Sequence, residues 1–215
     1  MKTLFTMLTV IASMMLHGQT VLTEELPVKN QKRLDLDISF ADEISIEYWS
    51  QPKVSVIAHV SINDGEADSL FSLITRSSAD YLTVKMDRER WERFAKQSRM
   101  NCISSEVKVE VKMPRTLDID AESISANFTL PYPDHEVNIK TISGDIDISM
   151  PEKSNMEFHA KTISGEVYSD LNISYPFGKE GLTQIVGMNI RGRINNGGPL
   201  SRLETISGDI FLRKN

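Results

Sequence analysis

The chain has 215 residues, a formal net charge of −6 and 25% charged residues. Its length allows one elongated domain or two small ones, and its acidic balance argues against nucleic acid as a partner, because phosphate binding needs a basic surface. Cys102 is the only cysteine, so no disulfide within one chain is expected.

Residues 1–19 have the pattern of a secretory signal peptide. Lys2 precedes an apolar run from Leu4 to Leu16, and the small and polar residues 17–19 follow it. The run is too short to span a bilayer comfortably, and no other stretch approaches about 18 consecutive apolar residues. We therefore expect export to the periplasm, the outer surface or the medium, and a mature chain without a transmembrane span.

The first part of the mature chain, residues 30–113, is rich in short segments with alternating apolar and polar residues. Such segments predict β-strands. They cover residues 34–38, 44–48, 54–60, 81–86 and 107–113.

Two segments interrupt this pattern. Residues 67–74 predict a brief helix or a loop beside a strand. Residues 87–99 carry Trp91, Phe94 and Ala95 at helical spacing among charged residues, which predicts an amphipathic cap over an end of the sheet or a surface loop.

The second part, residues 114–215, contains an internal repeat. The hexapeptide Thr-Ile-Ser-Gly-Asp-Ile occurs at 141–146, nearly unchanged at 162–167, and again at 205–210. Its glycines are 21 and then 43 residues apart, so a repeat of about 20 residues predicts an imperfect unit between the second and third copies. We place that unit at 190–194, around Gly192, after a surface loop at 175–181 and before a tight turn at 195–199. Residues 123–128 form a further unit with Ala126 in the glycine position.

One unit resembles a coil of a β-solenoid. Alternation places Ile142, Gly144 and Ile146 on one inward face of a strand, and the spacing to the preceding apolar residue predicts a corner near Lys140. A single coil cannot bury its apolar face, so neighbouring coils must stack on it. The sequence thus predicts an all-β fold, a β-solenoid or β-helix-like stack of short strands, in one elongated domain over 20–215. The expected inward repeat positions are Ile142, Gly144, Ile146, Ile163, Gly165, Val167, Ile206, Gly208 and Ile210.

Stacking would also align polar positions on the outside of the coils at about 4.8 Å. Asp145, Glu166 and Asp209 would form an exposed acidic ladder, and the threonines and serines of the repeats would form hydroxyl files. Calcium binding by the acidic ladder, and ice or carbohydrate binding by the hydroxyl files, are possible functions. Solvated surface positions are the more common outcome.

No catalytic, cofactor-binding or metal-binding residues are predicted, and no cofactor is expected. His59, His135 and His159 follow no metal-ligand spacing and are interpreted as surface or strand residues, and no nucleophile elbow or phosphate-binding glycine loop occurs.

The Thr-Ile-Ser-Gly-Asp-Ile units, the segment 107–114 leading into 117–119, and the Asn-Gly-Gly-Pro turn at 196–199 together resemble a known family. This is the "putative adhesin" family of exported bacterial β-strand-repeat proteins, a domain of unknown function. The resemblance covers most of the mature chain. It implies export and a β-solenoid-like fold, and it supplies no catalytic residues.

These observations favour a non-enzymatic, exported protein of the cell envelope or surface with an adhesin-like binding role. The partner would be an envelope or surface protein or a glycan. A polysaccharide-active β-helix enzyme is one alternative, and it would need a groove in which at least two carboxylates converge on a bound sugar. A structural or envelope-stress module is the other.

Overall fold

A computed structural model describes residues 19–97, 104–176 and 187–215. The signal-peptide prediction, Cys102 and most of the predicted loop at 175–181 lie outside these residues.

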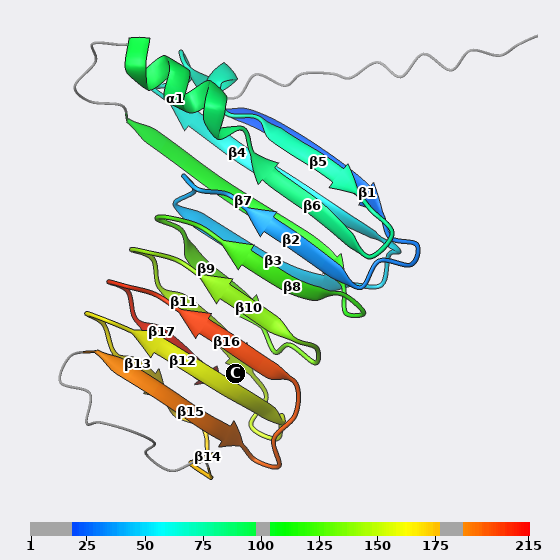
Figure 1. The fold of residues 1–215 in the computed structure, drawn as a ribbon, viewed down its shortest axis with the longest axis vertical. Coiled ribbons are helices and arrows are strands. Elements are labelled where there is room, and N and C mark those ends of the chain that lie inside the picture. The colour runs from blue at the N-terminus through cyan, green and yellow to red at the C-terminus, as the bar shows by residue number, and fades with distance from the viewer. Residues whose placement is uncertain (1–18, 98–103, 177–186) are drawn as a thin grey trace, which may run out of the picture.

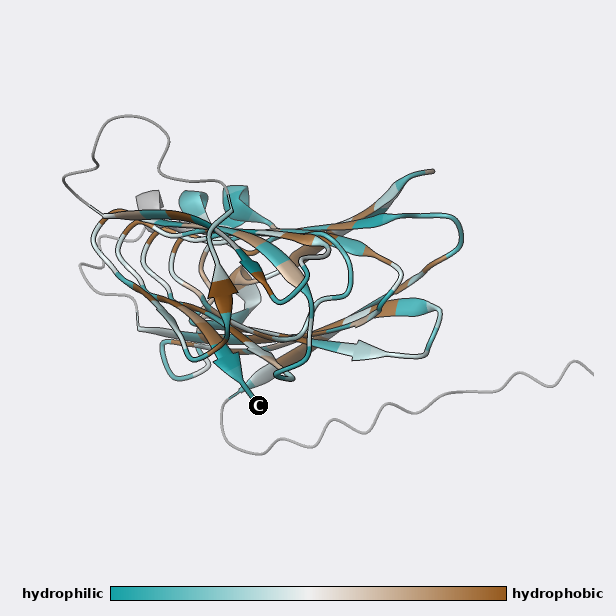
Figure 2. Ribbon diagram, turned by 90° about the horizontal axis from the view of Figure 1, so that it is seen from below, coloured by the Kyte–Doolittle hydropathy of each residue, from teal (hydrophilic) through white to brown (hydrophobic). Residues whose placement is uncertain are grey.

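The regular secondary structure of the described chain is almost entirely β-strand, and the strands form two sheets that face each other (Figures 1 and 2). Sheet A runs in the order β1 (Thr20–Pro27), β4 (Lys53–Ile62), β7 (Ser105–Pro114), β3 (Glu43–Trp49), β9 (Asn127–Pro131), β11 (Ile146–Met150), β17 (Ile210–Lys214) and β13 (Val167–Ser169). Sheet B runs in the order β14 (Ile173–Ser174), β15 (Met188–Ile194), β12 (Met156–Thr162), β16 (Leu200–Glu204), β10 (Val137–Lys140), β8 (Asp118–Glu122), β2 (Arg33–Asp37), β6 (Tyr81–Met86) and β5 (Leu73–Ser77). The five strands predicted in the first part of the chain are confirmed as β2, β3, β4, β6 and β7.

Rungs of backbone link the two sheets. Repeatedly the chain follows a strand of sheet B, turns a corner and returns along a strand of sheet A, as in β2–β3, β8–β9, β10–β11, β12–β13 and β16–β17. Equivalent strands of neighbouring rungs pair in parallel. The stack is therefore solenoid-like, as predicted, but antiparallel strands β1, β4, β5, β14 and β15 occupy its two ends.

The rungs do not stack in chain order. The rung β16–β17, which carries the third hexapeptide, lies between β10–β11 and β12–β13, which carry the first two. The prediction of an imperfect repeat unit between the second and third copies is wrong. Residues 190–194 belong to β15, which pairs antiparallel with β12 at the end of the sheet. The 43-residue interval exists because the chain leaves the stack, forms β14 and β15, and then returns into the gap between two earlier rungs.

The core fills the space between the sheets. Alternate residues of each strand point inward, because successive side chains of a strand face opposite sides. Leu34 of β2, Phe128 of β9 and Ile146 of β11 are fully buried, like Leu203 and Ile210 of the intercalated rung. Strands from both parts of the chain contribute to this one continuous core.

Two shorter elements complete the fold. Residues 67–74 form the 3₁₀-helix η1 (Asp68–Leu70) and the start of β5, and residues 87–99 contain the helix α1 (Arg88–Gln97). The Trp91 ring of α1 stacks on Phe40, with ring centroids 5.3 Å apart. The helix is thus the amphipathic cap, and it covers the β2–β3 corner near one end of the stack (Figure 1).

Candidate functional site

The corners of the repeats are held by buried threonines. The Thr205 hydroxyl accepts a hydrogen bond from the N–H of Gly208 at 3.1 Å and donates one to the carbonyl of Gly144 on the neighbouring rung at 3.0 Å. Thr162 and Thr141 repeat this pattern. Because these hydroxyls are buried and bonded, the threonine file predicted for the surface is instead part of the internal structure.

The repeat glycines are needed because the rungs approach closely at these corners. A Cβ built on Gly208 would lie 2.0 Å from the carbonyl oxygen of Gly144, and one built on Gly165 would lie 2.0 Å from that of Gly208. Neither backbone oxygen is free to move aside, since each accepts a threonine hydrogen bond.

The three residues of the predicted acidic ladder lie on adjacent rungs in the order Asp145, Asp209 and Glu166, and of these Glu166 is exposed while Asp145 and Asp209 are half-buried. The Asp145 carboxylate accepts the backbone N–H of Asp209, and the Asp209 carboxylate accepts that of Glu166, both at 2.8 Å. Two of the three carboxylates therefore bind backbone and help set the register of the rungs. The described residues contain no group of three or more His, Cys, Asp or Glu side chains arranged to hold a metal ion.

The second residue of each hexapeptide points outward, contrary to the prediction. Ile142, Ile163 and Ile206 are 42–44% exposed. They lie at the apex of the corner, where the alternation of the strand has not yet resumed; among the next apolar residues Ile146 and Ile210 are buried and Val167 is half-buried. With Ile124 they form an apolar file along one edge of the molecule. Phe40, in the corner of the rung beside Ile124, is covered by Trp91.

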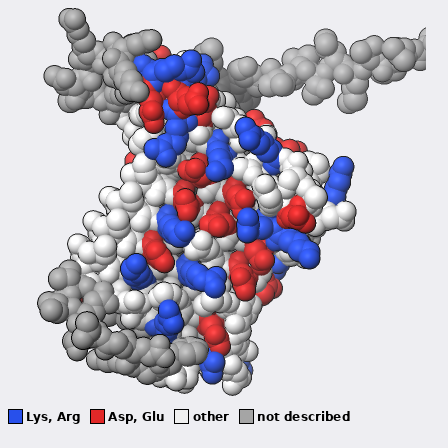
Figure 3. Space-filling view, viewed as in Figure 1, with Lys and Arg blue, Asp and Glu red and all other residues white. Residues whose placement is uncertain are grey.

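A large hollow lies on the outer face of sheet B, over β5, β6 and β2. We call it the Tyr81 groove. It encloses about 900 Å³ and is lined by Arg33, Asp35, Asp37, Ile74, Arg76, Ser77, Ser78, Tyr81, Thr83, Lys85, Met86, Asp87, Arg88 and Glu89. Figure 3 shows acidic and basic side chains mixed across this face, whereas the left margin of the view, below α1, is mostly uncharged.

The strand register explains the hollow. On the outer face of sheet B, Thr83 of β6 lies between two residues of the neighbouring strands, Arg76 of β5 and Asp35 of β2. The larger side chains of Tyr81 and Lys85 precede and follow it along β6. A small residue surrounded by long ones makes a floor with raised walls, and Thr83 is only 8% exposed.

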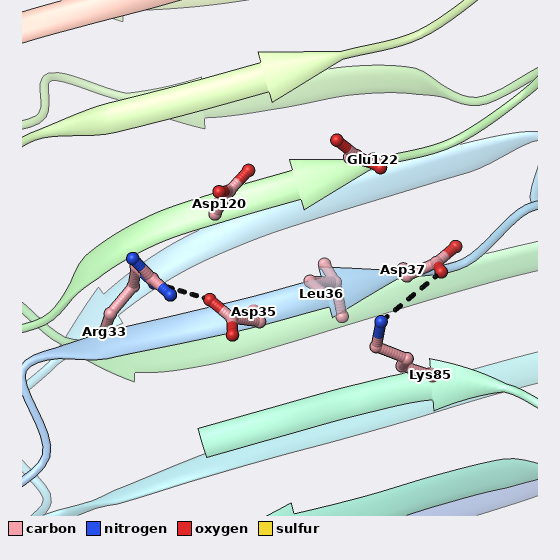
Figure 4. A pocket seen from close by; sticks show the side chains of 7 residues that line it. All are labelled: Arg33, Asp35, Leu36, Asp37, Lys85, Asp120 and Glu122. Atoms are coloured by element: carbon pink, nitrogen blue, oxygen red, sulfur yellow. Dashed lines mark hydrogen bonds and ion pairs between the residues drawn. The ribbon is translucent and has the colours of Figure 1, made fainter. Parts of the chain in front are cut away.

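A second, smaller hollow of about 210 Å³ continues from the first across β2 to β8 (Figure 4). It shares Arg33, Asp35, Asp37 and Lys85 with the Tyr81 groove and adds Asp120 and Glu122. Arg33 Nε donates a hydrogen bond to the Asp35 carboxylate at 2.6 Å, and this bond raises the pKa of the Arg33 guanidinium. The Lys85 ammonium lies 3.8 Å from the Asp37 carboxylate. Asp120 accepts a hydrogen bond from the Asn138 amide at 2.9 Å.

A separate polar cluster lies buried at the opposite corners of the rungs. His135 is 9% exposed, contrary to its interpretation as a surface or strand residue, and packs edge-on against Tyr48 with centroids 5.1 Å apart. Neither its ring nitrogens nor the Tyr48 hydroxyl has a hydrogen-bond partner in the described chain. Burial lowers the pKa of His135, although Asp134, 3.5 Å from Nδ1, opposes the shift.

Sequence reasoning found the repeat corners but missed the groove. Residues 33–37 and 81–86 were recognisable only as strands. Their parallel pairing, which brings Arg33 beside Tyr81, joins segments separated by three other strands in the sequence. An exposed tyrosine at the start of an otherwise alternating segment was the one available signal.

The part of the chain that the structure describes has no helix both long and apolar enough to cross a membrane.

The chain was compared with known proteins. The profile of one family, described as Toastrack DUF4097, matches residues 93–213. No curated protein matches the chain. Among solved structures, a "putative cell adhesion protein" from Clostridium sporogenes is similar with a TM-score of 0.57 and 9% identity, covering 92% of this chain and 100% of its own. A "putative adhesin" from Bacteroides fragilis gives a TM-score of 0.34 and 9% identity, covering 91% of this chain and 97% of its own. The first of these similarities supports the fold.

Proposed function

Because the chain belongs to the Toastrack DUF4097 family, a domain of unknown function, we propose that it is an exported, non-catalytic binding protein of the cell envelope or surface. Its partner binds the part of the outer face of sheet B that is formed by β5, β6, β2 and β8. The apolar run at residues 4–16 supports export. The Clostridium protein that shares the fold is described as a putative cell adhesion protein, which agrees with a binding role.

The continuous hollow over β5, β6, β2 and β8 is the observation that carries the proposal. Its main part encloses about 900 Å³, near the upper end of the range found for ligand sites, and it combines apolar and polar walls as such sites do. At the repeat corners, by contrast, the threonines and glycines are engaged in joining the rungs.

A polysaccharide-active enzyme is the alternative that the smaller hollow suggests, since four carboxylates line it. These are Asp35, Asp37, Asp120 and Glu122. Asp35 and Asp37 lie on β2, and Asp120 and Glu122 lie on the adjacent strand β8 (Figure 4). Each of these carboxylates already has a partner, in the order Arg33, Lys85, Asn138 and Lys140. This pairing favours binding over catalysis.

The proposal is tested by retention of the purified chain on isolated cell envelopes. Arg33→Ala combined with Tyr81→Ala, which removes two walls of the groove, should abolish most retention. Arg202→Ala combined with Tyr168→Ala removes the same two residue types elsewhere and should leave it intact. Equal retention of both double variants, or no retention of the unaltered chain, would contradict the proposal, as would hydrolysis of any glycan in a panel.

A further inference from the structure

We propose that the signal peptide is cleaved at the Gln19–Thr20 bond, and that the new α-ammonium of Thr20 forms an ion pair with the buried carboxylate of Asp68. The sequence predicts a signal peptide over residues 1–19, and the surroundings of Asp68 are an independent structural observation. The inference rests on the export that forms part of the proposed function, but it does not involve the binding face of sheet B.

The Asp68 carboxylate lies beside the first residue of β1. Asp68 is only 6% exposed. Its Oδ1 accepts the backbone N–H of Ile62 at 2.7 Å, and its Oδ2 accepts the backbone N–H of Thr20 at 3.1 Å. No lysine, arginine or histidine among the described residues forms an ion pair with it. A buried carboxylate is costly unless a positive charge pairs with it, so a cation bound at this position would stabilise the fold.

The strand register indicates that the sheet is built for a chain that starts at Thr20. β1 pairs antiparallel with β4, and Thr20 lies opposite Val60. β4 continues beyond Val60 to Ile62. A longer β1 would offer its next hydrogen-bonding residue to Ile62, because such residues occur at every second position of an antiparallel pair. The Asp68 carboxylate takes that place by accepting the Ile62 N–H, so β1 begins with its first nitrogen against a carboxylate.

Cleavage would change the charge of this nitrogen without any other change at the site. A signal peptidase hydrolyses the bond with one water molecule. The C–N bond breaks, the water oxygen bonds to the carbonyl carbon of Gln19, which leaves as a carboxylate, and both water protons end on the Thr20 nitrogen as an ammonium. This ammonium lies where the peptide N–H donates to Asp68 at 3.1 Å. Hydrogen bonds between charged groups are about twice as strong as those between neutral groups.

The mature chain should therefore be more stable than its precursor. In the precursor, Thr20 offers Asp68 only a neutral peptide N–H, and the charge of the carboxylate is not balanced. In the mature chain the same contact becomes an ion pair. Removal of the signal peptide thus stabilises the folded state once the chain has been exported.

The position of the cut is tested on the chain recovered from the envelope of cells that express all 215 residues. Intact-mass measurement and N-terminal sequencing should both show a chain that starts at Thr20. A chain that starts at any other residue, or that keeps residues 1–19, overturns the inference.

The ion pair is tested by urea unfolding of two purified chains, each released from a fusion protein without extra residues. One chain starts at Thr20. The other starts at Gly18, which restores a peptide N–H at Thr20 and moves the ammonium to an earlier residue. We expect the folding equilibrium constant of the Thr20 chain to be about tenfold larger. Equal stability of the two chains overturns the ion pair.

A substitution identifies the partner of the ammonium. Asp68→Asn removes the negative charge and keeps a side-chain oxygen, so in this background the two chains should agree within about twofold. Asp64→Asn is the matched control, because Asp64 lies in the same turn but is exposed, and here a difference of about tenfold should persist. A persisting difference with Asp68→Asn, or its loss with Asp64→Asn, overturns the assignment. The comparison of the two unsubstituted chains stays decisive even if Asp68→Asn does not fold.

Failure of this inference is distinguishable from failure of the proposed binding function. Both purified chains should be retained on cell envelopes to the same extent, because Thr20 lies on sheet A and the Tyr81 groove lies on sheet B. Retention of both chains together with equal stability overturns the ion pair alone. A stability difference without retention supports the ion pair and overturns the binding function alone.

Discussion

At the scale of single residues, the repeat corner is where the backbone tolerates least change. Each corner places a glycine against the carbonyl of the next rung and binds that carbonyl with a threonine hydroxyl. The geometry of stacking thus accounts for the threonine and the glycine of the hexapeptide, and its polar surface positions follow from the same geometry.

Gly208→Ala is expected to destabilise the fold by about 3 kcal/mol, because the added methyl would collide with the carbonyl of Gly144. Glu166→Ala should change stability by less than about 0.5 kcal/mol, since Glu166 ends the acidic ladder and is exposed. Urea unfolding of both variants measures the difference. Similar losses would mean that the glycine position is not sterically restricted.

His135 should make stability depend on pH. Above its ordinary pKa of 6.5 the imidazole is neutral in both the folded and unfolded states. Below 6.5 the unfolded chain binds a proton while the folded chain, whose His135 pKa is lowered by burial, does not until a lower pH. The free energy of unfolding should therefore fall as pH falls from 6.5 towards the folded pKa. Around the ring stand Asp134, Asp118, Arg115 and the Tyr48 hydroxyl, whose own pKa burial raises.

The measurement compares urea unfolding at about pH 7.5 and about pH 5.5 for the unaltered chain and for His135→Phe, which should lose less stability on acidification. His159→Gln is the control, because His159 lies on the outer face of β12, bonded to Asn189. The explanation fails if the two variants respond alike to acid.

At the scale of elements, Trp91 is the described side chain that stacks α1 on the rungs. Trp91 stacks on Phe40 with an interplanar angle of 25°, while Arg88, Glu89, Arg90, Glu92 and Arg93 of the helix are exposed. The helix covers the corner beside one end of the apolar file, and the strands beneath it pair without its help.

Trp91→Ala should therefore release α1 without unfolding the sheets. We expect faster amide hydrogen exchange in residues 88–97 and a loss of global stability of about 1–2 kcal/mol. Glu92→Ala on the exposed side should leave exchange unchanged. Uniformly faster exchange in β2 and β3 as well would show that the helix supports the stack itself.

Element by element, the sequence was informative where periodicity alone decides the structure. Alternation located the strands, and the repeat located the corners. Alternation gave the wrong side for Ile142, Ile163 and Ile206, because the corner interrupts the strand for a few residues and the alternation of buried and exposed residues starts again after it. The groove escaped prediction for another reason: its walls come from β2, β5 and β6, and pairing between separated strands is not encoded in the pattern of either strand.

At the scale of the whole molecule, the intercalated rung joins parts of the stack that are distant in sequence. β16 pairs with both β10 and β12, and β17 pairs with both β11 and β13. A solenoid whose coils follow chain order can lose an end coil and keep the rest. This stack cannot lose its last rung in chain order and keep the rest, because that rung lies inside the stack.

Deleting residues 200–215, which removes both β16 and β17, should therefore remove protection well beyond the deletion. We expect β12 and β13 to lose slow hydrogen exchange, because the strands β16 and β17 with which they pair are gone, while β2, β3 and β7 at the other end stay protected. Exchange measured strand by strand checks this. Retained protection of β12 and β13 would show that these strands are held by β15 and not by the intercalated rung.

The same intercalation has a consequence for biosynthesis. A ribosome delivers residues 141–174 before residues 200–214, so the slot that the later rung fills stands open while the chain is still emerging. Its walls carry the unpaired backbone edges of β10, β11, β12 and β13, which are sites for pairing with another nascent chain. A chaperone that holds the early rungs apart until translation has passed Lys214 would serve this topology better than one that speeds their collapse.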